Sequence, residues 1–444
     1  MIEVRCFQNF EELAPLRGEI NALNLASVNA DPFSTLEFYE SYLRHDQLLS
    51  ESKGFRLCFL AAFDDGCLVG YLPLKLTRFR VFGLRVTKVD FFAVHDIDLP
   101  HLVARTDLAL PVANAFHGYL FGSDMKWGLL EFQQQTYESL LFQIPFQTAP
   151  KGYRIRHWPG WSNWTIQIRW KSLQEYVKEI PKKARSNFSR QMRNLHVAGS
   201  LEFIGSSDPA VTPALLELYL GIETYSWKAL AALTIGRNSV RIEYFKSLLA
   251  AGQPMRISIA LLLLDGLPIA GLINGIYGDT LYALQVVFDD RHKLVSPGSA
   301  ILFLGVREAI VGQYRFFNLL AGFDHFKNRW LAEATETQST QIYRTSSPLF
   351  WRRIFGDLVR SIVLHIRKRS AMFLFPARKI IALPIEDSDA SCAVSETRLT
   401  TEQRSRIAAL IAEVRCGQHQ SLSAAELAAA MPFKMPLSGS QVDV

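Results

Sequence analysis

Two stretches of the chain show the same succession of apolar runs and turns. In each, an apolar run ends at an Asp-Gly dipeptide and a second apolar run follows. The turns are Asp65-Gly66, between runs 56–63 and 67–74, and Asp265-Gly266, between runs 256–264 and 267–277. This pattern predicts a β-hairpin, because both central residues of a type I′ turn need positive φ. The 200-residue separation of the two hairpins indicates a duplicated domain.

The second half continues as a mixture of strands and helices. Strands are expected at 281–288 and 316–320, and helices at 173–179, 182–196, 300–311 and around Lys327 and Trp330. Pro181 separates the first two helices, and Gly199 and Gly312 end the second and third. Such an order predicts an α/β (α+β) protein in which mixed central sheets are flanked by helices.

We divide the 444 residues into four segments, because one hydrophobic core does not serve a chain of this length. They are an N-terminal domain (1–150), a second domain (151–345), a basic amphipathic helical segment (346–384), and a linker with an Ala-rich tail (385–444). In the tail, Thr400-x-x-Gln403 and Ser423-x-x-Glu426 are capping boxes that open short helices. We expect this tail to be loosely attached or partly disordered.

The composition is that of a globular protein, with 49% hydrophobic and 20% charged residues. Five scattered cysteines without a C-x-x-C pair argue against a disulfide framework or zinc site and for a reducing compartment. The start lacks a signal-peptide pattern, and the apolar runs are shorter than the roughly 18 residues of a membrane span. We therefore expect a cytoplasmic protein. His95-Asp96-Ile97-Asp98 has no accompanying His/Cys cluster, so no metal site is predicted.

The net charge of +6 comes from one segment, 351–380, which carries eight basic residues and one acid. This local excess does not indicate a nucleic-acid-binding protein. Basic and apolar residues alternate there at helical spacing, as in helices that lie on anionic lipid at the inner face of a membrane. The alternative is a C-terminal helix docked on the protein with its arginines in water, and we slightly favour it.

One short motif points to an anionic ligand. Ser296-Pro297-Gly298-Ser299 follows a predicted strand and precedes a predicted helix. At such a junction, backbone N–H groups and the positive helix end suit a phosphate, and glycine permits close approach. The same residues also serve as an ordinary helix cap, so the motif by itself leaves both interpretations open.

Several motifs of the second half occur in the order known from one superfamily. They are WTIQIRW with KKARSNFSRQMRNLHVAGSLEF, Trp227-Lys228, DGLPIAG, LQVVFDD with SPGSAIL, and LLAGFDHFKNRW. Over about 180 residues the chain thus resembles GNAT acyltransferases, in particular the branch with the CelD-type acetyltransferases of cellulose biosynthesis loci and the Fem peptidoglycan aminoacyltransferases. The resemblance of 30–145 is thinner. Taken together, the resemblance implies tandem GNAT-like domains. The first domain is expected to lack a donor site, because no SPG-like loop follows the hairpin of that domain.

The resemblance also implies an acyl-CoA donor, in particular acetyl-CoA, without a metal. Its pantetheine arm would pair with Gln285, Val286, Val287 and Phe288, and its pyrophosphate would lie on Ser296, Pro297, Gly298, Ser299 and Ala300. Direct acyl transfer needs a base, an oxyanion partner and an acid. The candidates are Asp324 as base, Lys327 as oxyanion partner and Tyr282 as acid. For each, an ion pair or a place in the core is the alternative.

Five residues are candidates for binding the acceptor. Lys183, Arg185 and Arg190, on a helix with five positive charges and no acid between them, would recognise phosphate or carboxylate, and Trp227 and Lys228 form the recurring W-K. A solvated helix face and a core tryptophan are the alternatives. The sequence departs from the family pattern at Asn318, where an acid is expected, and at Phe326, where Tyr is commoner.

Three functions remain in competition. The leading hypothesis is a transfer of an acyl group from acyl-CoA to an amine or hydroxyl of a cell-envelope or polysaccharide-related acceptor. The second is a Fem-type transferase that uses aminoacyl-tRNA, although the chain lacks the sustained heptads of a coiled-coil insertion. The third is a non-catalytic tandem protein that binds an envelope precursor or a partner.

Overall fold

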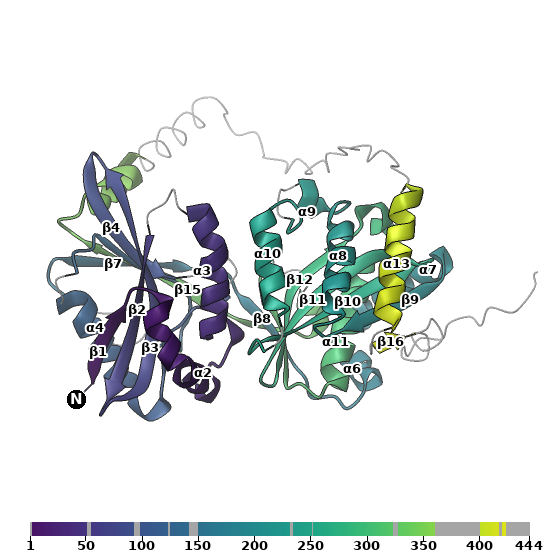
Figure 1. Ribbon diagram of the computed structural model, residues 1–444, viewed down its shortest axis with the longest axis horizontal. Helices are drawn as coiled ribbons and strands as arrows, with labels where there is room; N and C mark the ends of the chain where they lie inside the picture. The colour runs from purple at the N-terminus through teal and green to yellow at the C-terminus, as the bar shows by residue number, and fades with distance from the viewer. Residues whose placement is uncertain are drawn as a thin grey trace, which may run out of the picture.

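The computed structural model describes residues 2–50, 55–92, 98–122, 125–141, 150–230, 234–250, 252–322, 327–359, 400–416 and 420–422. Within them the chain forms two large mixed sheets, each flanked by helices (Figure 1). The predicted α/β class is therefore confirmed. Both Asp-Gly turns are also confirmed, since Asp65, Gly66, Asp265 and Gly266 all have positive φ.

The first sheet is built mainly from the N-terminal half. Its strands lie in the order β1 (Glu3–Phe7), β2 (Phe55–Asp64), β3 (Cys67–Val81), β4 (Leu84–Phe91), β6 (Leu129–Thr136), β15 (Thr337–Arg344) and β7 (Tyr153–Pro159), with β5 (Val103–Ala104) beside β3. Its helices are α1 (Phe10–Leu13), η1 (Ala14–Leu16), α2 (Arg17–Ala26), η2 (Pro32–Ser34), α3 (Leu36–Ser50), η3 (Thr106–Leu108) and α4 (Ala109–Gly122). Strands β4 and β6 are parallel.

The second sheet lies in the order β14 (Glu333–Thr335), β8 (Asn163–Gln167), β13 (Phe316–Ala321), β12 (Thr280–Phe288), β11 (Leu267–Tyr277), β10 (Arg256–Leu264), β9 (Leu201–Ser206) and β16 (Gln420–Leu422). Its helices are α6 (Leu173–Glu179), α7 (Lys182–Ala198), α8 (Thr212–Glu223), α9 (Trp227–Leu230), α10 (Ser239–Leu248), η4 (Asp290–Val295), α11 (Pro297–Val311), η5 (Lys327–Trp330) and α13 (Thr401–Cys416). The helices predicted from 173 to 311 are thus confirmed.

Both faces of the second sheet are buried, as the near-continuous apolar run of β10 requires. Alternate residues of β10 point to opposite sides: Leu261 and Leu263 pack with α8 and α10, whereas Leu262 packs with α6, α7 and α11. The core on the α8 side continues into the first half, where it includes Phe33 and Tyr71. The two halves therefore share one hydrophobic core.

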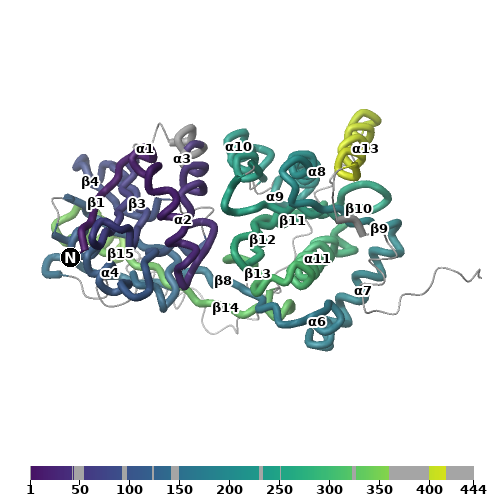
Figure 2. Tube along the Cα trace, turned by 60° about the horizontal axis from the view of Figure 1, so that its bottom comes forward, coloured from purple at the N-terminus to yellow at the C-terminus, as the bar shows by residue number. Residues whose placement is uncertain are grey.

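Two extended segments pass from one sheet to the other. The first runs from β7 in the first sheet to β8 in the second, and the other runs from β14 in the second sheet to β15 in the first. Figure 2 shows β8 and β14 side by side between the two halves. In the first sheet, β15 lies between β6 and β7 and pairs with both. After forming most of the second sheet, the chain thus returns to the first sheet and completes it with β15.

The sheet to which β7 and β15 belong differs from the domain boundaries expected from the sequence. The boundaries at 150/151 and 345/346 assign β7 and β15 to the second domain, but both strands belong to the first sheet. The reason is that β15 pairs with β6, about 200 residues away in the chain, and no local pattern specifies such a partner. We use "first domain" and "second domain" below for the bodies built on the first and second sheets.

The tail is more firmly attached than expected. The Thr400 capping box forms, because Thr400 N donates to Gln403 Oε1 (2.9 Å) and Gln403 N donates to Thr400 Oγ1 (3.1 Å). Helix α13 then packs on α8, buries Leu410 and Val414, and pairs Arg406 with Glu217. Its apolar face explains this docking. The Ser423 capping box and the segment 360–399 lie outside the described residues.

Candidate active site

The central feature of the second sheet is a gap between its two parallel strands. Strands β12 and β13 pair from Thr280–Phe316 to Tyr282–Asn318, and the pairing ends there although β12 continues to Phe288. A bulge in β12, opposite Ile273 and Asn274, lies just beyond this point. The backbone of residues 283–288 therefore faces the gap over about 20 Å.

Side chains keep β13 away from β12. Leu320 has a left-handed backbone (φ 59°), and its N–H donates to Asn318 Oδ1 (2.8 Å). Ala321 N donates to Asp98 Oδ1 (2.8 Å), and Lys327 Nζ donates to the carbonyls of Leu319 (2.9 Å) and Leu320 (2.7 Å). Because side chains satisfy these backbone groups, the end of β13 does not need β12 as a partner.

Asn318 has a clear role in this arrangement. Asn163 Nδ2 donates to Asn318 Oδ1 (3.2 Å) and also to Asp98. A carboxylate at 318 would share the Asn163 amide with Asp98 and place two like charges together. An amide at this position accepts the same hydrogen bonds without that repulsion.

The motif Ser296-Pro297-Gly298-Ser299 lies at the far end of the gap. Ser296 has a left-handed backbone (φ 56°) and turns the chain into α11, which begins at Pro297. A Cβ atom on Gly298 would lie 2.8 Å from Phe288 Cδ1, so only glycine lets the first turn of α11 approach β12 this closely. Ser299 N and Ala300 N both point at the Ser296 carbonyl, at 3.0 and 3.4 Å. The gap thus runs from a helix N-terminus at Gly298 to Tyr282.

Lys228 lies beside the gap. Its Nζ donates to Gln285 Oε1 (2.9 Å), and burial lowers the pKa of this lysine to about 8 against the opposing effect of Glu223. Lys228 therefore contacts the donor strand that the sequence predicts, whereas Trp227 is half-exposed. Burial likewise raises the pKa of Glu223.

The basic helix α7 lies at the phosphate-loop end of the gap. It packs against η4 and α11, so its charges are not at the Tyr282 end. Arg185 donates to the Val177 and Lys178 carbonyls and thereby caps α6, whereas Lys183 and Arg190 are exposed. Helix α7 thus lies beside η4 and α11, and the acceptor role expected for its basic residues stays a prediction.

At the other end, a cavity of about 160 Å³ opens between the two domains. We call it the interdomain cavity. It is lined by Asn29, Ala30, Asp31, Phe33, Asp98, Leu99, Pro100, His101, Gln134, Gln135, Thr136 and Ser139 of the first domain and by Tyr282 and Asn318 of the second. Tyr282 and Asn318 are the last paired residues of β12 and β13, so the cavity adjoins the start of the gap.

Three titratable groups of this cavity are strongly affected by burial. It raises the pKa of Asp98 to about 6, although the hydrogen bonds from Ala321 and Asn163 and the nearby Lys327 lower it. It also raises the pKa of Asp31, against the attraction of His101, and that of Tyr282, whose hydroxyl lies 3.5 Å from the Ala30 carbonyl. The Phe33 and Tyr282 rings meet edge to face at 5.7 Å.

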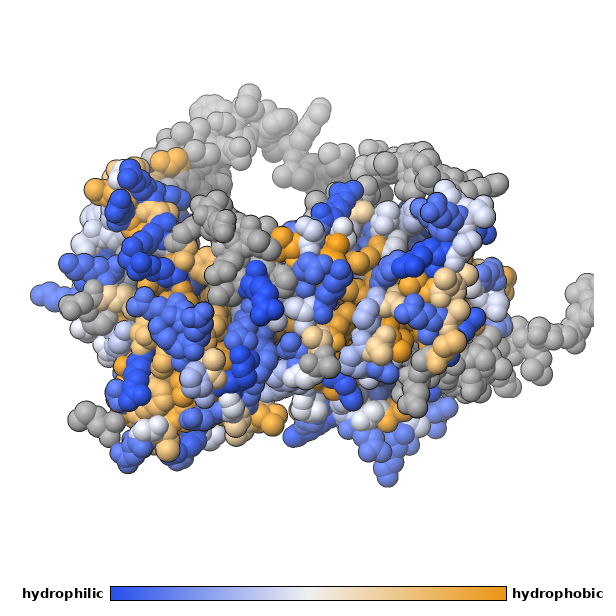
Figure 3. Space-filling model, in the orientation of Figure 1, coloured by the Kyte–Doolittle hydropathy of each residue, from blue (hydrophilic) through white to orange (hydrophobic). Residues whose placement is uncertain are grey.

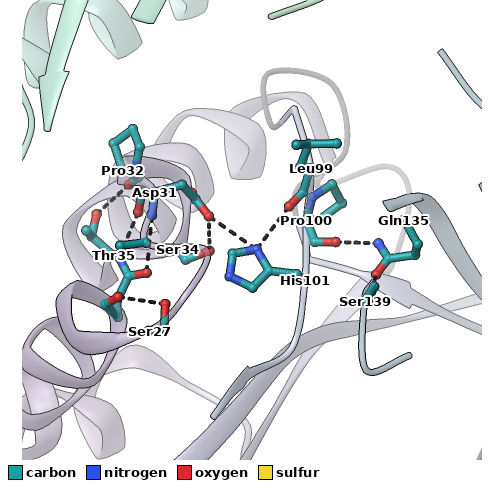
Figure 4. A network of polar contacts seen from close by, with 12 residues as sticks. Ser27, Asp31, Pro32, Ser34, Thr35, Leu99, Pro100, His101, Gln135 and Ser139 are labelled. Carbon is teal, nitrogen blue, oxygen red and sulfur yellow. Dashed lines mark hydrogen bonds and ion pairs between the residues drawn. The ribbon is translucent and has the colours of Figure 1, made fainter. Parts of the chain in front are cut away.

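Asp31 and His101 form a pair across the wall of the cavity (Figure 4). His101 Nδ1 lies 3.2 Å from Asp31 Oδ2 and 3.1 Å from the Leu99 carbonyl. Both partners are acceptors, so the contacts favour the tautomer with the proton on Nδ1, in which Nε2 is an acceptor. Among the described residues, neither His101 Nε2 nor Asp31 Oδ1 has a hydrogen-bond partner, and both atoms are buried.

The sequence did not predict the contribution of the first domain. Asp31, Asp98 and His101 lie in or beside loops; of the three, only Asp98 belongs to a motif considered in the sequence, His95-Asp96-Ile97-Asp98, for which no metal site is predicted. Asp324, His95 and Asp96 lie outside the described residues. Within the described part of the chain, no group of three His, Cys, Asp or Glu residues is arranged to hold a metal ion.

The residues around the gap match a known protein family. Residues 182–328 match the family model described as an acetyltransferase (GNAT) domain. This part of the second domain is therefore similar to GNAT acetyltransferase domains. The match begins at the basic helix α7 and ends just after Lys327, so it includes the gap and the phosphate loop. The protein is accordingly an acyltransferase. No curated protein shows significant sequence similarity to the chain.

Solved structures resemble the chain only distantly. FemX matches at 11% identity and a TM-score of 0.49, covering 76% of this chain and 96% of FemX. A tandem GNAT protein of the clavulanic acid biosynthesis pathway matches at 12% identity and a TM-score of 0.39, covering 78% and 99% of the two chains. A lysylphosphatidylglycerol synthetase C-terminal domain from Agrobacterium fabrum matches at 11% and 0.42, covering 73% and 94%. At these values the likeness supports no conclusion on donor or acceptor.

Proposed function

We propose that the protein transfers an acyl group from acyl-CoA, in particular acetyl-CoA, and that the donor binds in the gap between β12 and β13. The observation that carries this proposal is the end of the β12–β13 pairing at Tyr282–Asn318, which leaves residues 283–288 free to pair with an extended ligand. The pantetheine amides would bond to Gln285, Val286, Val287 and Phe288. The helix end at Gly298 then receives the pyrophosphate.

The charges near the gap support this orientation of the donor. Helix α7 lies against η4 and α11, where Lys183 and Arg190 would attract the phosphates. With the phosphates at Gly298, the thioester reaches the Tyr282 end, beside the interdomain cavity. Calorimetric titration with acetyl-CoA tests the assignment, and saturable binding is expected.

We assign Lys327 a positioning role. Two of its three N–H donors hold the carbonyls of Leu319 and Leu320, and the side chain is buried. These bonds fix the end of β13 and thereby keep the gap open. Tyr282, at the start of the gap, stays protonated because burial raises its pKa, and it would donate a proton to the leaving thiolate.

For the acceptor we propose an amine or hydroxyl of a cell-envelope or polysaccharide-related molecule. The support is the ordered set of second-domain motifs that resembles the CelD-type and Fem branch. A Fem-type use of aminoacyl-tRNA is the second candidate; it predicts no binding of acetyl-CoA, so the same titration separates the two.

We further propose that the segment 351–380 contacts anionic membranes peripherally. The described part of this segment belongs to a helix at 348–359, which exposes Trp351, Phe355, Leu358 and Val359 beside Arg352. Apolar and basic side chains together match an anionic lipid surface. Among the described residues, no helix combines the length and apolar character needed to cross a bilayer.

Vesicle co-sedimentation measures this contact. We expect the protein to bind phosphatidylglycerol-containing vesicles and the double variant Trp351→Ser/Phe355→Ser to bind at least about tenfold more weakly, because each apolar side chain contributes roughly 1.5–3 kcal/mol on burial. Val311→Ser, which also removes an exposed apolar side chain, is the control and should bind like the wild type. Equal binding by the double variant would contradict the proposal.

A further inference from the structure

In the interdomain cavity, two buried acceptor atoms have no hydrogen-bond partner among the described residues. They are Asp31 Oδ1 and His101 Nε2, and they belong to two residues that already contact each other at 3.2 Å. A buried acceptor without a hydrogen bond costs free energy, and such groups are retained where a ligand completes them. The cavity has a mainly apolar lining into which a few polar groups are set, and it adjoins the end of the gap where the thioester would lie.

We propose that the first domain supplies the acceptor end of the active site: His101 Nε2 binds and deprotonates the acceptor amine, and Asp31 positions the imidazole. This inference rests on the proposed acyl-CoA binding in the second domain. It assigns a function to the first domain, which carries no SPG-like loop and which the family match does not include.

The charge of the cavity indicates the acceptor class. Asp31 and Asp98 line it, and among the described residues no Lys or Arg does so, the nearby Lys327 being held by the Leu319 and Leu320 carbonyls. Two carboxyl groups attract a cation and repel a phosphate or carboxylate. An ammonium group is a donor without an acceptor atom, so it can satisfy Asp31 Oδ1 and His101 Nε2 together. We therefore expect a primary amine.

The reaction balances with these groups. His101 Nε2 takes one proton from the ammonium, and Asp31 Oδ2 stabilises the resulting imidazolium through Nδ1–H. The amine nitrogen then forms a bond to the thioester carbonyl carbon and loses its second proton, and the carbon–sulfur bond breaks. The thiolate takes up a proton, so the amide, free CoA thiol and one net proton are the products.

The test uses the full chain, n-butylamine as acceptor probe and acetyl-CoA as donor. His101→Asn is the decisive variant, because its amide nitrogen can replace Nδ1–H toward Leu99 and Asp31 while Nε2 is lost. Asp31→Asn removes the charge, and Asp31→Glu is the conservative variant. His157→Gln is the matched control, since His157 Nδ1 also has a side-chain partner, Thr340 Oγ1 at 2.9 Å, but does not line the cavity.

Saturation-transfer NMR and release of CoA thiol are the two readouts. We expect the wild type to bind n-butylammonium but not n-butanol or butyrate. The variant Asp31→Asn should no longer bind n-butylammonium. Turnover number should fall by roughly 10²–10⁴-fold in His101→Asn, with acetyl-CoA affinity unchanged within about twofold and partial rescue by Asp31→Glu. His157→Gln should behave like the wild type.

Three results would overturn the proposal. They are the absence of n-butylammonium binding to the wild type, binding without thiol release, and undiminished turnover in His101→Asn. Preference for n-butanol would overturn the amine class. Failure of the donor site has a different signature, because the wild type would then bind no acetyl-CoA in calorimetry whatever the amine result.

Discussion

Replacing Gly298 by Trp should weaken acetyl-CoA binding by roughly 100-fold or more. The reason is steric: even a Cβ atom at 298 would lie 2.8 Å from Phe288 Cδ1. A large side chain there must move the first turn of α11 away from β12 or fill the predicted pyrophosphate site. Isothermal titration calorimetry measures the loss directly.

The matched control is Gly18→Trp. Gly18 is the second residue of α2, as Gly298 is the second residue of α11, but a Cβ atom on Gly18 meets nothing within 4 Å. This variant should bind acetyl-CoA like the wild type. Undiminished binding by Gly298→Trp would show that the donor lies elsewhere, and thermal unfolding of both variants separates a lost site from a lost fold.

The second large effect concerns β15, the strand with which the chain returns to the first sheet. Ile342 lies in β15, in the C-terminal part of the chain, yet it is fully buried in the core of the first sheet. We expect Ile342→Ala to lower the free energy of unfolding by roughly 2–5 kcal/mol, because it leaves a cavity there. Denaturant titration measures the change, and Val197→Ala, at a side chain that is 86% exposed, should change it by less than about 0.5 kcal/mol.

The packing of β15 also predicts which strands lose stability in Ile342→Ala. Ile342 packs in one core with Leu72 of β3, and the neighbouring Tyr71 packs in a second core that continues to Ile273 of β11. Ile342→Ala should therefore speed hydrogen exchange in β11 as well as in β3. Mass spectrometry of peptides from both strands tests this. Faster exchange in β3 alone would mean that the domains unfold independently.

Local chemistry explains which elements the sequence could predict. The Asp-Gly turns, the helix end at Gly199 and the Thr400 capping box each depend on a few neighbouring residues, and all form as expected. The turn at Ser296 and the start of α11 at Pro297 are predictable for the same reason, because the order of strand, glycine and helix is contiguous in the chain.

The strand order of the first sheet and the residues of the interdomain cavity depend instead on contacts between residues far apart in the sequence. The position of β15 between β6 and β7 follows from pairing across about 200 residues, for which no turn or period gives a signal. Likewise, Asp31 and His101 are ordinary loop residues until packing brings them together beside Tyr282. The sequence predicts Lys327 as an oxyanion partner, but only the fold shows that its ammonium binds the carbonyls of β13.

The most direct test of the account is the stoichiometry of acetyl-CoA binding to the full chain. Among the described residues, splayed parallel strands with a proposed phosphate loop beside them occur in the second domain alone. Calorimetric titration should therefore give one saturable site per chain, which Gly298→Trp abolishes. Two equivalent sites would contradict the assignment of different roles to the two domains. No binding of acetyl-CoA or of longer acyl-CoAs would contradict the acyl-CoA donor itself.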